Sequence, residues 1–497
     1  MRKILLTAIS LFVVAALVGC GGSNSSSSTT TPPSGGGGNP VGFSISSLKG
    51  TYVFSDIGIN SVNVNFAVAG FFVADGAGNI SSGAEDYFDD SGVQIQNETL
   101  TGTYTVSADG RGQLNLTQFP SGEALVYRFV MQSPGAASFF QVSNSAEATG
   151  RIQLQSAVNG SVLAGKSTYV IRLDGEDNGK NIYGAVGALT INSTSISGTV
   201  DQNDDGLFSP LLTAVGSDFE PNANGRGTLS FTVGGINHDF VYYWVSPSHI
   251  ELVGSDANFW LHGYADLQTA PASSNAALSG GQVIALSGIN ANSVLIENAR
   301  LTLDGNGGIN SGVEDHNQSG SYTANSAFAG TYAVSTTGSG RWTASIVDVS
   351  SNLVGWQVSP QQSVVLAYNS ANSLTETGTM RAQSTNIASL TNAGISGEYA
   401  ENMSGKNLNL SGYVEVTANF HADGAGNLSG TLDTQTPSSF NAAVSATGVY
   451  STNSNGRGAG TIAGVPVVIY FVDADTMYLI SSDGGLIYQG KMVMQQP

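Results

Sequence analysis

Four landmarks recur in the same order along the 497-residue chain, and this internal repeat constrains the fold more than any other feature. The landmarks are a Leu/Ile-x-Gly opening, a Ser-Gly-x-x-Asp segment, a Gly/Arg turn and a closing strand that ends near a glutamine. Successive copies of each landmark lie between 112 and 118 residues apart. The landmark residues are Gly50, Gly165, Gly280 and Gly397; Asp86, Asp201, Asp315 and Asp433; Arg111, Arg226, Arg341 and Arg457; and Gln153, Gln268, Gln383 and Gln495. The chain therefore contains four copies of one folding unit.

The pattern within a unit is that of short β-strands. In the first unit, Tyr104, Val106, Leu114 and Leu116 alternate with polar residues on both sides of a Gly-rich turn at 109–112. Alternation with a period of two, interrupted by Asp-Gly and Asn-Gly turns, is typical of β-hairpins. The chain also combines 41% hydrophobic residues with 64 glycines and only 10% charged residues. This composition favours many strands joined by tight turns and argues against a disordered chain.

About eight strands fit into each unit, so the sequence predicts an all-β protein of four tandem units. Each unit is expected to be an eight-stranded antiparallel up-and-down barrel, because closure leaves no exposed strand edge. The alternative is a β-sandwich, whose seven to nine short strands would give a similar pattern. In size, strand number and Gly-x-Tyr opening, the unit resembles avidin-like and lipocalin-like barrels. That resemblance implies a barrel able to enclose one small ligand.

The N-terminus has the layout of a secretory signal. Arg2 and Lys3 precede an apolar run over 4–18, which is too short for an ordinary transmembrane helix. The segment Leu17-Val18-Gly19-Cys20 resembles the lipobox of bacterial lipoprotein precursors, and Cys20 is the only cysteine in the chain. The resemblance implies cleavage before Cys20 and attachment of lipid to its thiol. Gly21, in place of Asp, favours sorting to the outer membrane by the rule for double-membraned bacteria.

The sequence divides into six segments. Residues 20–44 follow the signal and form a tether rich in Gly, Ser and Pro, which is too polar to bury a core. The joints between the repeat units are short and polar, so they predict a stubby rod with limited bending. The expected segments are a signal peptide at 1–19, the lipidated tether at 20–44, and β units at 45–155, 161–268, 277–383 and 394–497.

The charge of the chain excludes some partners. The formal net charge is −20, and it becomes −22 once the signal with Arg2 and Lys3 is removed. Such a charge keeps the protein soluble and opposes binding to nucleic acid or to an anionic lipid surface. The expected contact with a membrane is therefore through the lipid anchor.

The recurring aspartate and arginine suggest one charge pair in each unit. We expect Arg111 to pair with Asp86, and the pattern to repeat as Asp201 with Arg226, Asp315 with Arg341, and Asp433 with Arg457. A buried arginine needs such a partner, because an unpaired buried charge is costly. The pair could form a site at one end of a barrel, or it could be a structural bridge.

A second candidate site lies in the second unit, where 201–206 resembles the start of a calcium-binding loop. Asp201, Asn203 and Asp205 place oxygen ligands at alternate positions before a glycine. An EF-hand would have a bidentate Glu at the twelfth position, where this chain has Leu212. The alternative is an acidic hairpin tip that binds no metal.

The remaining motifs do not predict catalysis. The sequence contains no Gly-x-Ser-x-Gly elbow, His-Glu-x-x-His motif or phosphate loop, and its histidines lack the spacing of metal ligands. Clustered aromatics could stack on a glycan or a partner protein, or could pack between units. The histidines are His238, His249, His262, His316 and His421, and the aromatics are Tyr242, Tyr243, Trp244, Trp260, Trp342 and Trp356.

These observations favour a non-enzymatic, lipid-anchored envelope protein whose repeats serve binding, adhesion or spacing, with a glycan or a protein as partner. The second hypothesis is a set of barrels that carry small ligands, and the third is a secreted hydrolase. The barrel interiors discriminate between the first two, because a packed core opposes a carrier and a lined cavity favours one.

Overall fold

The eight strands of every repeat hydrogen-bond to one another in sequence order, and the first strand pairs with the last. All of these pairings are antiparallel, so each repeat is a closed up-and-down barrel, as predicted, and not a sandwich. The structure is a computed structural model that describes residues 42–143, 146–158, 166–219, 221–254, 256, 259–347, 351–410, 412–437 and 439–497. The signal peptide, Cys20 and Gly165 lie outside the described residues.

The strands alternate along the chain with short turns. Barrel 1 consists of β1 (Lys49–Ile59), β2 (Asn65–Asp75), β3 (Asn79–Asp89), β4 (Gln94–Val106), β5 (Arg111–Phe119), β6 (Ala124–Ser133), β7 (Ala136–Gln141) and β8 (Glu147–Leu154). Barrel 2 consists of β9 (Ser167–Asp177), β10 (Ile182–Asn192), β11 (Ser195–Asp204), β12 (Leu207–Phe219), β13 (Arg226–Val233), β14 (Ile236–Ser246), β15 (His249–Gly254) and β16 (Phe259–Leu267).

Barrel 3 consists of β17 (Gly280–Asn290), β18 (Ser293–Leu303), β19 (Gly308–Gln318), β20 (Ser321–Val334), β21 (Arg341–Ile346), β22 (Asn352–Ser359), β23 (Gln362–Asn369) and β24 (Leu374–Ala382). Barrel 4 consists of β25 (Ser396–Asn407), β26 (Gly412–Asp423), β27 (Asn427–Thr436), β28 (Ser439–Thr452), β29 (Arg457–Ile462), β30 (Val465–Phe471), β31 (Thr476–Ser481) and β32 (Leu486–Met494). The short 3-10 helices are η1 (Ile45–Ser47), η3 (Asn275–Ala277), η4 (Ile387–Ser389) and η5 (Asn392–Gly394).

The Asp-Gly turns have a common local cause. The Oδ1 atom of Asp75 accepts hydrogen bonds from the backbone N–H groups of Ala77 (2.7 Å) and Asn79 (3.0 Å), and Gly76 adopts a φ of 80° between them. A side chain that replaces the backbone acceptor in this way is the reason that Asp leads such turns. Asp304 and Asp423 make the same contacts in barrels 3 and 4, which explains why the turn recurs in the sequence.

The interior of each barrel is filled by inward-facing apolar side chains. In barrel 1, Tyr52, Phe72 and Phe129 are almost completely buried in one cluster, and each of the other barrels has its own equivalent cluster. A tyrosine closes one end of three barrels by donating a hydrogen bond to a backbone carbonyl in the entering segment. These bonds are Tyr104 to Leu48 (2.7 Å), Tyr332 to Leu278 (2.7 Å) and Tyr450 to Ile395 (2.6 Å).

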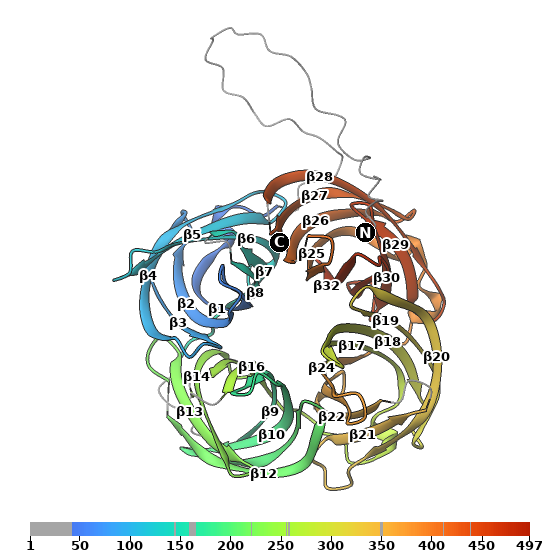
Figure 1. Cartoon of the computed structure of the whole chain (residues 1–497). Helices are drawn as coiled ribbons and strands as arrows, with labels where there is room; N and C mark the ends of the chain where they lie inside the picture. The colour runs from blue at the N-terminus through green and yellow to red at the C-terminus, as the bar shows by residue number, and fades with distance from the viewer. Residues whose placement is uncertain are drawn as a thin grey trace, which may run out of the picture. The chain divides into compact units, whose positions relative to one another are not determined.

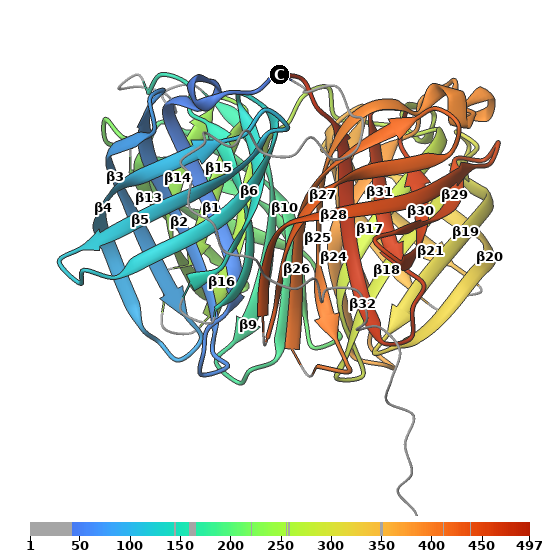
Figure 2. The same ribbon diagram turned by 90° about the horizontal axis from the view of Figure 1, so that it is seen from above.

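The four barrels form a ring within the compact unit of residues 38–497 (Figures 1 and 2). The early strands of one barrel contact the late strands of the next, and β26 of barrel 4 contacts β6, β7 and β8 of barrel 1 in the same way. A head-to-tail contact that repeats with a constant rotation forms a ring when the successive rotations add up to a full turn. The expectation of a stubby rod is therefore wrong, because the fourth unit returns to the first.

Candidate binding chamber

The recurring aspartates and arginines form ion pairs between barrels, and not within them. Asp86 of barrel 1 accepts two hydrogen bonds from Arg226 of barrel 2, both of 2.8 Å, so the expected pair of Arg111 with Asp86 is replaced. In the same way Asp201 pairs with Arg341, Asp315 with Arg457, and Asp433 with Arg111. Each arginine therefore binds the aspartate of the preceding barrel. The four aspartates are fully buried, and each barrel-to-barrel contact contains one such pair.

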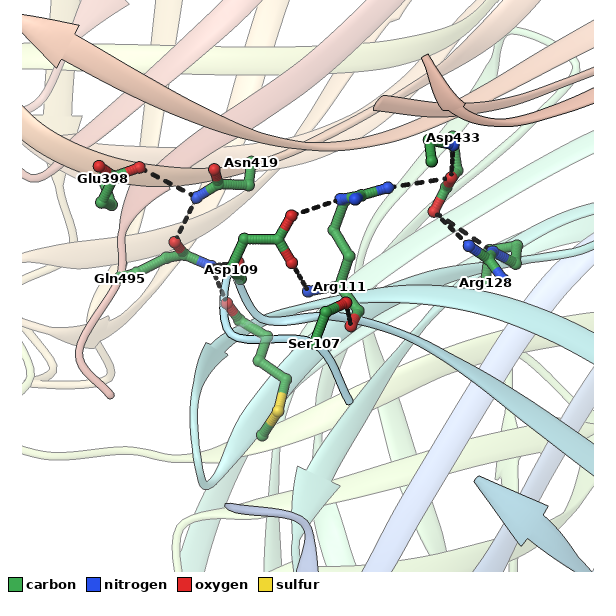
Figure 3. Close-up of polar contacts among 10 residues, drawn as sticks. Ser107, Asp109, Arg111, Arg128, Glu398, Asn419, Asp433 and Gln495 are labelled. Atoms are coloured by element: carbon green, nitrogen blue, oxygen red, sulfur yellow. Dashed lines mark hydrogen bonds and ion pairs between the residues drawn. The ribbon is translucent and has the colours of Figure 1, made fainter. Parts of the chain in front are cut away.

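A further donor supports each of these pairs. Tyr243 donates to Asp86 at 2.5 Å, Trp356 donates to Asp201 at 2.8 Å, and Tyr470 donates to Asp315. These aromatics lie opposite the pairing arginine in the sheet register, where barrel 1 has Val130. At the contact between barrels 4 and 1, a second arginine therefore takes the place of the aromatic donor. Arg128 Nη2 lies 3.1 Å from Asp433 Oδ2, and Figure 3 shows that Arg111 and Arg128 both contact this carboxylate.

Each aspartate also fixes a β-bulge in its own barrel. The Oδ1 atom of every one of them accepts a backbone N–H from a residue with positive φ, between 52° and 55°. The four strand pairings shift register at the position of the aspartate. The donors are Asn97, Leu211, Asn325 and Ala443. The Ser-Gly-x-x-Asp landmark is thus a structural element that shapes the strand and joins it to the next barrel.

The calcium prediction finds no support in the positions of its side chains. The carboxylate of Asp201 accepts bonds from Arg341, from Trp356 and from the N–H of Leu211, and so it is already surrounded by donors. Asn203 is buried, and its side-chain N–H donates a hydrogen bond of 2.7 Å to the carbonyl of Leu374 in barrel 3. Asp205 is exposed in the following turn. Among the described residues, no group of three His, Cys, Asp or Glu side chains could hold a metal ion.

The aromatic side chains that alternate on β14 divide between two environments. Tyr242 and Trp244 point into the core of barrel 2. Tyr243 points outward and packs with Val53 and Phe71 of barrel 1. Trp356 does the same between barrels 2 and 3, whereas Trp342 lies in the core of barrel 3. Packing within and between units therefore accounts for these aromatics.

Glutamines near the ends of the units join barrels in a way that sequence reasoning missed. The side-chain N–H of Gln268 donates to the carbonyls of Ser339 and Gln357 in barrel 3, at 2.9 and 2.8 Å. Gln495 of barrel 4 donates similarly to Asp109 and Met131 of barrel 1, at 3.1 and 2.7 Å. Gln383 makes the equivalent contact with barrel 4, and in barrel 1 the equivalent residue is Gln155 and not Gln153, the landmark taken from the sequence. The recurrence of a glutamine at the end of the closing strand was the available signal.

A chamber of 430 Å³ lies where all four barrels meet. The first and last strand of every barrel contribute to its wall: β1 and β8, β9 and β16, β17 and β24, and β25 and β32. In each barrel these two strands form the seam that closes the barrel. The seam lies between the face that contacts the preceding barrel and the face that contacts the following barrel. Figure 1 shows these strands on the inner side of the ring. The chamber therefore exists only because the ring closes.

One side of the chamber contains a charge network centred on the buried Glu251. Arg151 of barrel 1 contacts Glu251 of barrel 2 through two nitrogens, at 2.6 and 2.8 Å. His249 bridges Glu251 and Asp266, at 2.8 and 2.6 Å. Burial alone would raise the pKa of Glu251, but Arg151 and His249 lower it to about 2. Burial likewise opposes the charged form of His249, yet Glu251 and Asp266 raise its pKa to about 9.

A second network joins barrels 2 and 3 at the chamber wall. Arg172 Nε lies 3.0 Å from Asp174 and 3.2 Å from the hydroxyl of Thr377, which itself donates to Asp174. His262 lies nearby, and burial lowers its pKa to about 4, so this imidazole is neutral at pH 7. Tyr264 lies under Arg151, with the guanidinium 4.9 Å from the ring centroid. The wall thus combines satisfied ion pairs with neutral aromatic surface.

Barrel 3 contains a separate cavity of 240 Å³ near one end of its core. Glu297, Glu314, Glu376 and His316 line it, and His316 contacts Glu314 at 2.5 Å. Burial and the charge of Glu314 raise the pKa values of Glu297 and Glu376 well above the ordinary range. This cavity is an exception to the packed interiors that the four core clusters describe.

Comparison with known proteins identifies no family. No family model matches the chain, and no curated protein does. Solved structures of transferrin binding protein B are similar at a low level. A mutant from Haemophilus parasuis Hp5 is 9% identical, with a TM-score of 0.21 over 95% of this chain and 99% of that one. The protein from serogroup B Neisseria meningitidis is 11% identical, with a TM-score of 0.18 over 74% of this chain and 82% of that one. These scores are too low for any inference about this chain to rest on them.

Among the described residues, no helix is long and apolar enough to cross a membrane.

Proposed function

We propose that this protein is a non-enzymatic, lipid-anchored binding protein of the bacterial cell envelope, and that its ligand occupies the central chamber. The observation that carries the proposal is the 430 Å³ chamber built by the seams of all four barrels. Ligand pockets in proteins have volumes of roughly 300–1,000 Å³ and combine apolar walls with a few placed polar groups. The chamber has that size and that mixture.

The chemistry of the wall favours binding over catalysis. Glu251, a buried carboxylate of the wall, is held ionised by Arg151 and His249, and a general acid would need a pKa near the working pH. Arg172 and Asp174 neutralise each other through a short contact. Such groups orient a ligand through hydrogen bonds and charge. Of the roles considered for the repeats, binding therefore has the most support.

Anchoring through Cys20 forms the other half of the proposal and rests on the lipobox resemblance. Metabolic labelling with a radioactive fatty acid tests it, since the wild-type chain should incorporate label and Cys20→Ala should not. An unlabelled wild-type chain would refute the anchor. Sorting to the outer membrane is tested by fractionation of the same cells.

A matched pair of tryptophan substitutions tests the chamber. Ser287 lines the chamber and Ser345 is exposed on β21 of the same barrel, so Ser287→Trp should fill the chamber and Ser345→Trp should not. The full-length protein is screened against a glycan array and a panel of sugars, amino acids and organic acids. We expect Ser287→Trp to abolish the binding that Ser345→Trp retains. Equal binding by the two variants would refute the chamber as the site.

A ligand carried inside a barrel is the second candidate, and the 240 Å³ cavity in barrel 3 is the observation that favours it. Ser326 lines that cavity. Loss of binding in Ser326→Trp, with retention in Ser287→Trp, would assign the ligand to barrel 3 and not to the chamber.

A further inference from the structure

The cationic groups of the chamber differ in whether they have a partner. Three of them line the wall: Arg151, Arg172 and Lys491. Arg151 is paired with Glu251 at 2.6 Å, and Arg172 with Asp174 at 3.0 Å. Within the described part of the chain, the side chain of Lys491 makes no hydrogen bond and no ion pair. Glu251 and Asp174 are thus matched by the two arginines. Burial and Glu85 raise the pKa of Asp56, the third carboxyl group of the lining, well above its ordinary range, so the ammonium of Lys491 is left over.

The position of Lys491 explains why it has no partner. It lies on β32, where outward-facing residues alternate with the core residues Tyr488 and Met492. Its outward neighbours are used for assembly, since Gln489 donates to the carbonyl of Leu286 in barrel 3 at 2.9 Å. Lys491 is the next outward-facing residue along the strand, and it lines the chamber.

Charged and polar groups with opposing effects surround Lys491. Burial lowers the pKa of Lys491 and is the largest effect, whereas Tyr478 and Asp473 raise the pKa and Arg381 and Arg151 lower it. A largely buried ammonium without a carboxylate partner is destabilised, and a bound anion would relieve that cost. In a chain with 36 acidic and 16 basic residues, a lysine without an acidic partner is unexpected by chance.

Neutral donors complete the surroundings. The hydroxyl of Tyr478 lies 3.2 Å from that of Thr379, and both residues line the chamber with Lys491. Asn402 lies on the adjacent strand β25, opposite Lys491 in the sheet register, and also lines the chamber, where its amide donates to Thr149 and to the carbonyl of Val416 at 3.4 Å. Hydroxyl donors beside an ammonium are groups that bind carboxylate and phosphate oxygens in proteins.

We propose that the chamber ligand carries an anionic group, a carboxylate, a phosphate or a sulfate, which binds the ammonium of Lys491. This inference rests on the proposed function, since it places the anion in the same chamber. The anion bridges the seam of barrel 4 to the donors that barrel 3 contributes. The ion pairs of Arg151 and Arg172 remain intact and form the rest of the wall.

The test uses full-length protein and probes that differ in charge but little in size. Glucuronate is compared with glucose, and inorganic phosphate and sulfate are titrated separately, all by calorimetry at constant ionic strength. We expect at least one anion to bind, with an affinity at least tenfold above that of glucose. The three anions distinguish a carboxylate ligand from a phosphate or sulfate ligand.

The variants are Lys491→Met, which keeps the apolar stem, Lys491→Arg, which keeps the charge, and Lys49→Met, which removes a charge at an exposed position at the start of β1. We expect Lys491→Met to weaken anion binding at least tenfold, and the other two variants to stay within about threefold of the wild type. Melting temperatures of all variants show whether each is folded.

The outcomes separate the two proposals. Anion binding that Lys491→Met leaves unchanged overturns the role of Lys491. A neutral ligand that Ser287→Trp excludes, together with no anion binding, overturns the anionic ligand but supports the chamber. Binding that neither Lys491→Met nor Ser287→Trp affects overturns both proposals.

Discussion

Arg111 Nη1 lies 3.2 Å from Asp433 Oδ1 across the contact between barrels 1 and 4, although 322 residues separate the two. The three other pairs of this kind join barrels that follow one another in the chain. This pair joins the ends and closes the ring. Asp433 also binds Arg128, and Arg128 lies 5.8 Å over the ring of Phe440, so the aspartate of the closing contact pairs with two arginines.

Asp433→Asn should weaken the closing contact. The substitution leaves Arg128 without an anion and leaves Arg111 with Asp109 alone, and removing one partner of a buried pair costs about 3–5 kcal/mol. We expect a lower free energy of unfolding and a larger radius of gyration by small-angle X-ray scattering, because no peptide joint holds barrel 4 against barrel 1. Asp86→Asn is the matched control, since it should lower stability but leave the radius nearly unchanged. A radius unaffected by Asp433→Asn would contradict this role.

Tyr243→Phe should lower stability by removing one donor to Asp86. Hydrogen bonds to charged groups contribute about 1.5–3 kcal/mol. Denaturant unfolding of Tyr243→Phe, of Asp86→Asn and of the double variant gives the coupling energy. A coupling close to zero would mean that the hydroxyl does not support the ion pair.

The raised pKa of His249 predicts that the stability of the protein depends on pH. Its folded-state pKa of about 9 lies above the ordinary value of 6.5, so the stabilisation is fully present below pH 6.5 and is lost as the pH rises through 9. The loss should reach about 3 kcal/mol at most. Denaturation between pH 6 and 9.5 measures it, and His249→Gln should flatten the profile over that window. An NMR titration giving a pKa below 7 would refute the network as described.

Glu401→Gln should stabilise the protein at neutral pH. Glu401 is fully buried in barrel 4, where burial raises its pKa from 4.5 to about 8. A raised carboxyl pKa means that stability falls as the pH rises from about 4.5 to 8, by about 3 kcal/mol at pH 7. The neutral amide avoids this loss. Glu123→Gln, at an exposed position, should change stability little, and equal effects of the two variants would contradict the prediction.

Leu211→Gly should stabilise barrel 2 despite the loss of a side chain. Leu211 is half-exposed and has a φ of 54°, a conformation that costs a residue with a Cβ about 1–2 kcal/mol. Glycine adopts it without that cost and keeps the N–H that binds Asp201. Val215→Gly, at an equally exposed site of ordinary φ on the same strand, should instead destabilise. The melting temperatures of both variants check the sign.

The sequence by itself determined the repeat, the number of strands per unit and the all-β class. These follow from local rules, since alternating side chains and Asp-Gly turns specify hairpins wherever they occur. The turn at Asp75 and the inward Tyr104 could both be placed from the pattern alone. The sequence also singled out Asp86 and Arg111 as equivalent residues of every unit.

Only the tertiary structure decided which arginine binds which aspartate. A repeat pattern is identical for pairs within a unit and pairs between units, because equivalent residues recur at the same spacing in both cases. The choice depends on which way each side chain leaves the barrel, and the bulge at Asp86 turns it toward Arg226. The ring and its chamber depend further on the rotation between barrels, which no local pattern encodes. Lys491 became a candidate binding residue only when that rotation placed it at the centre.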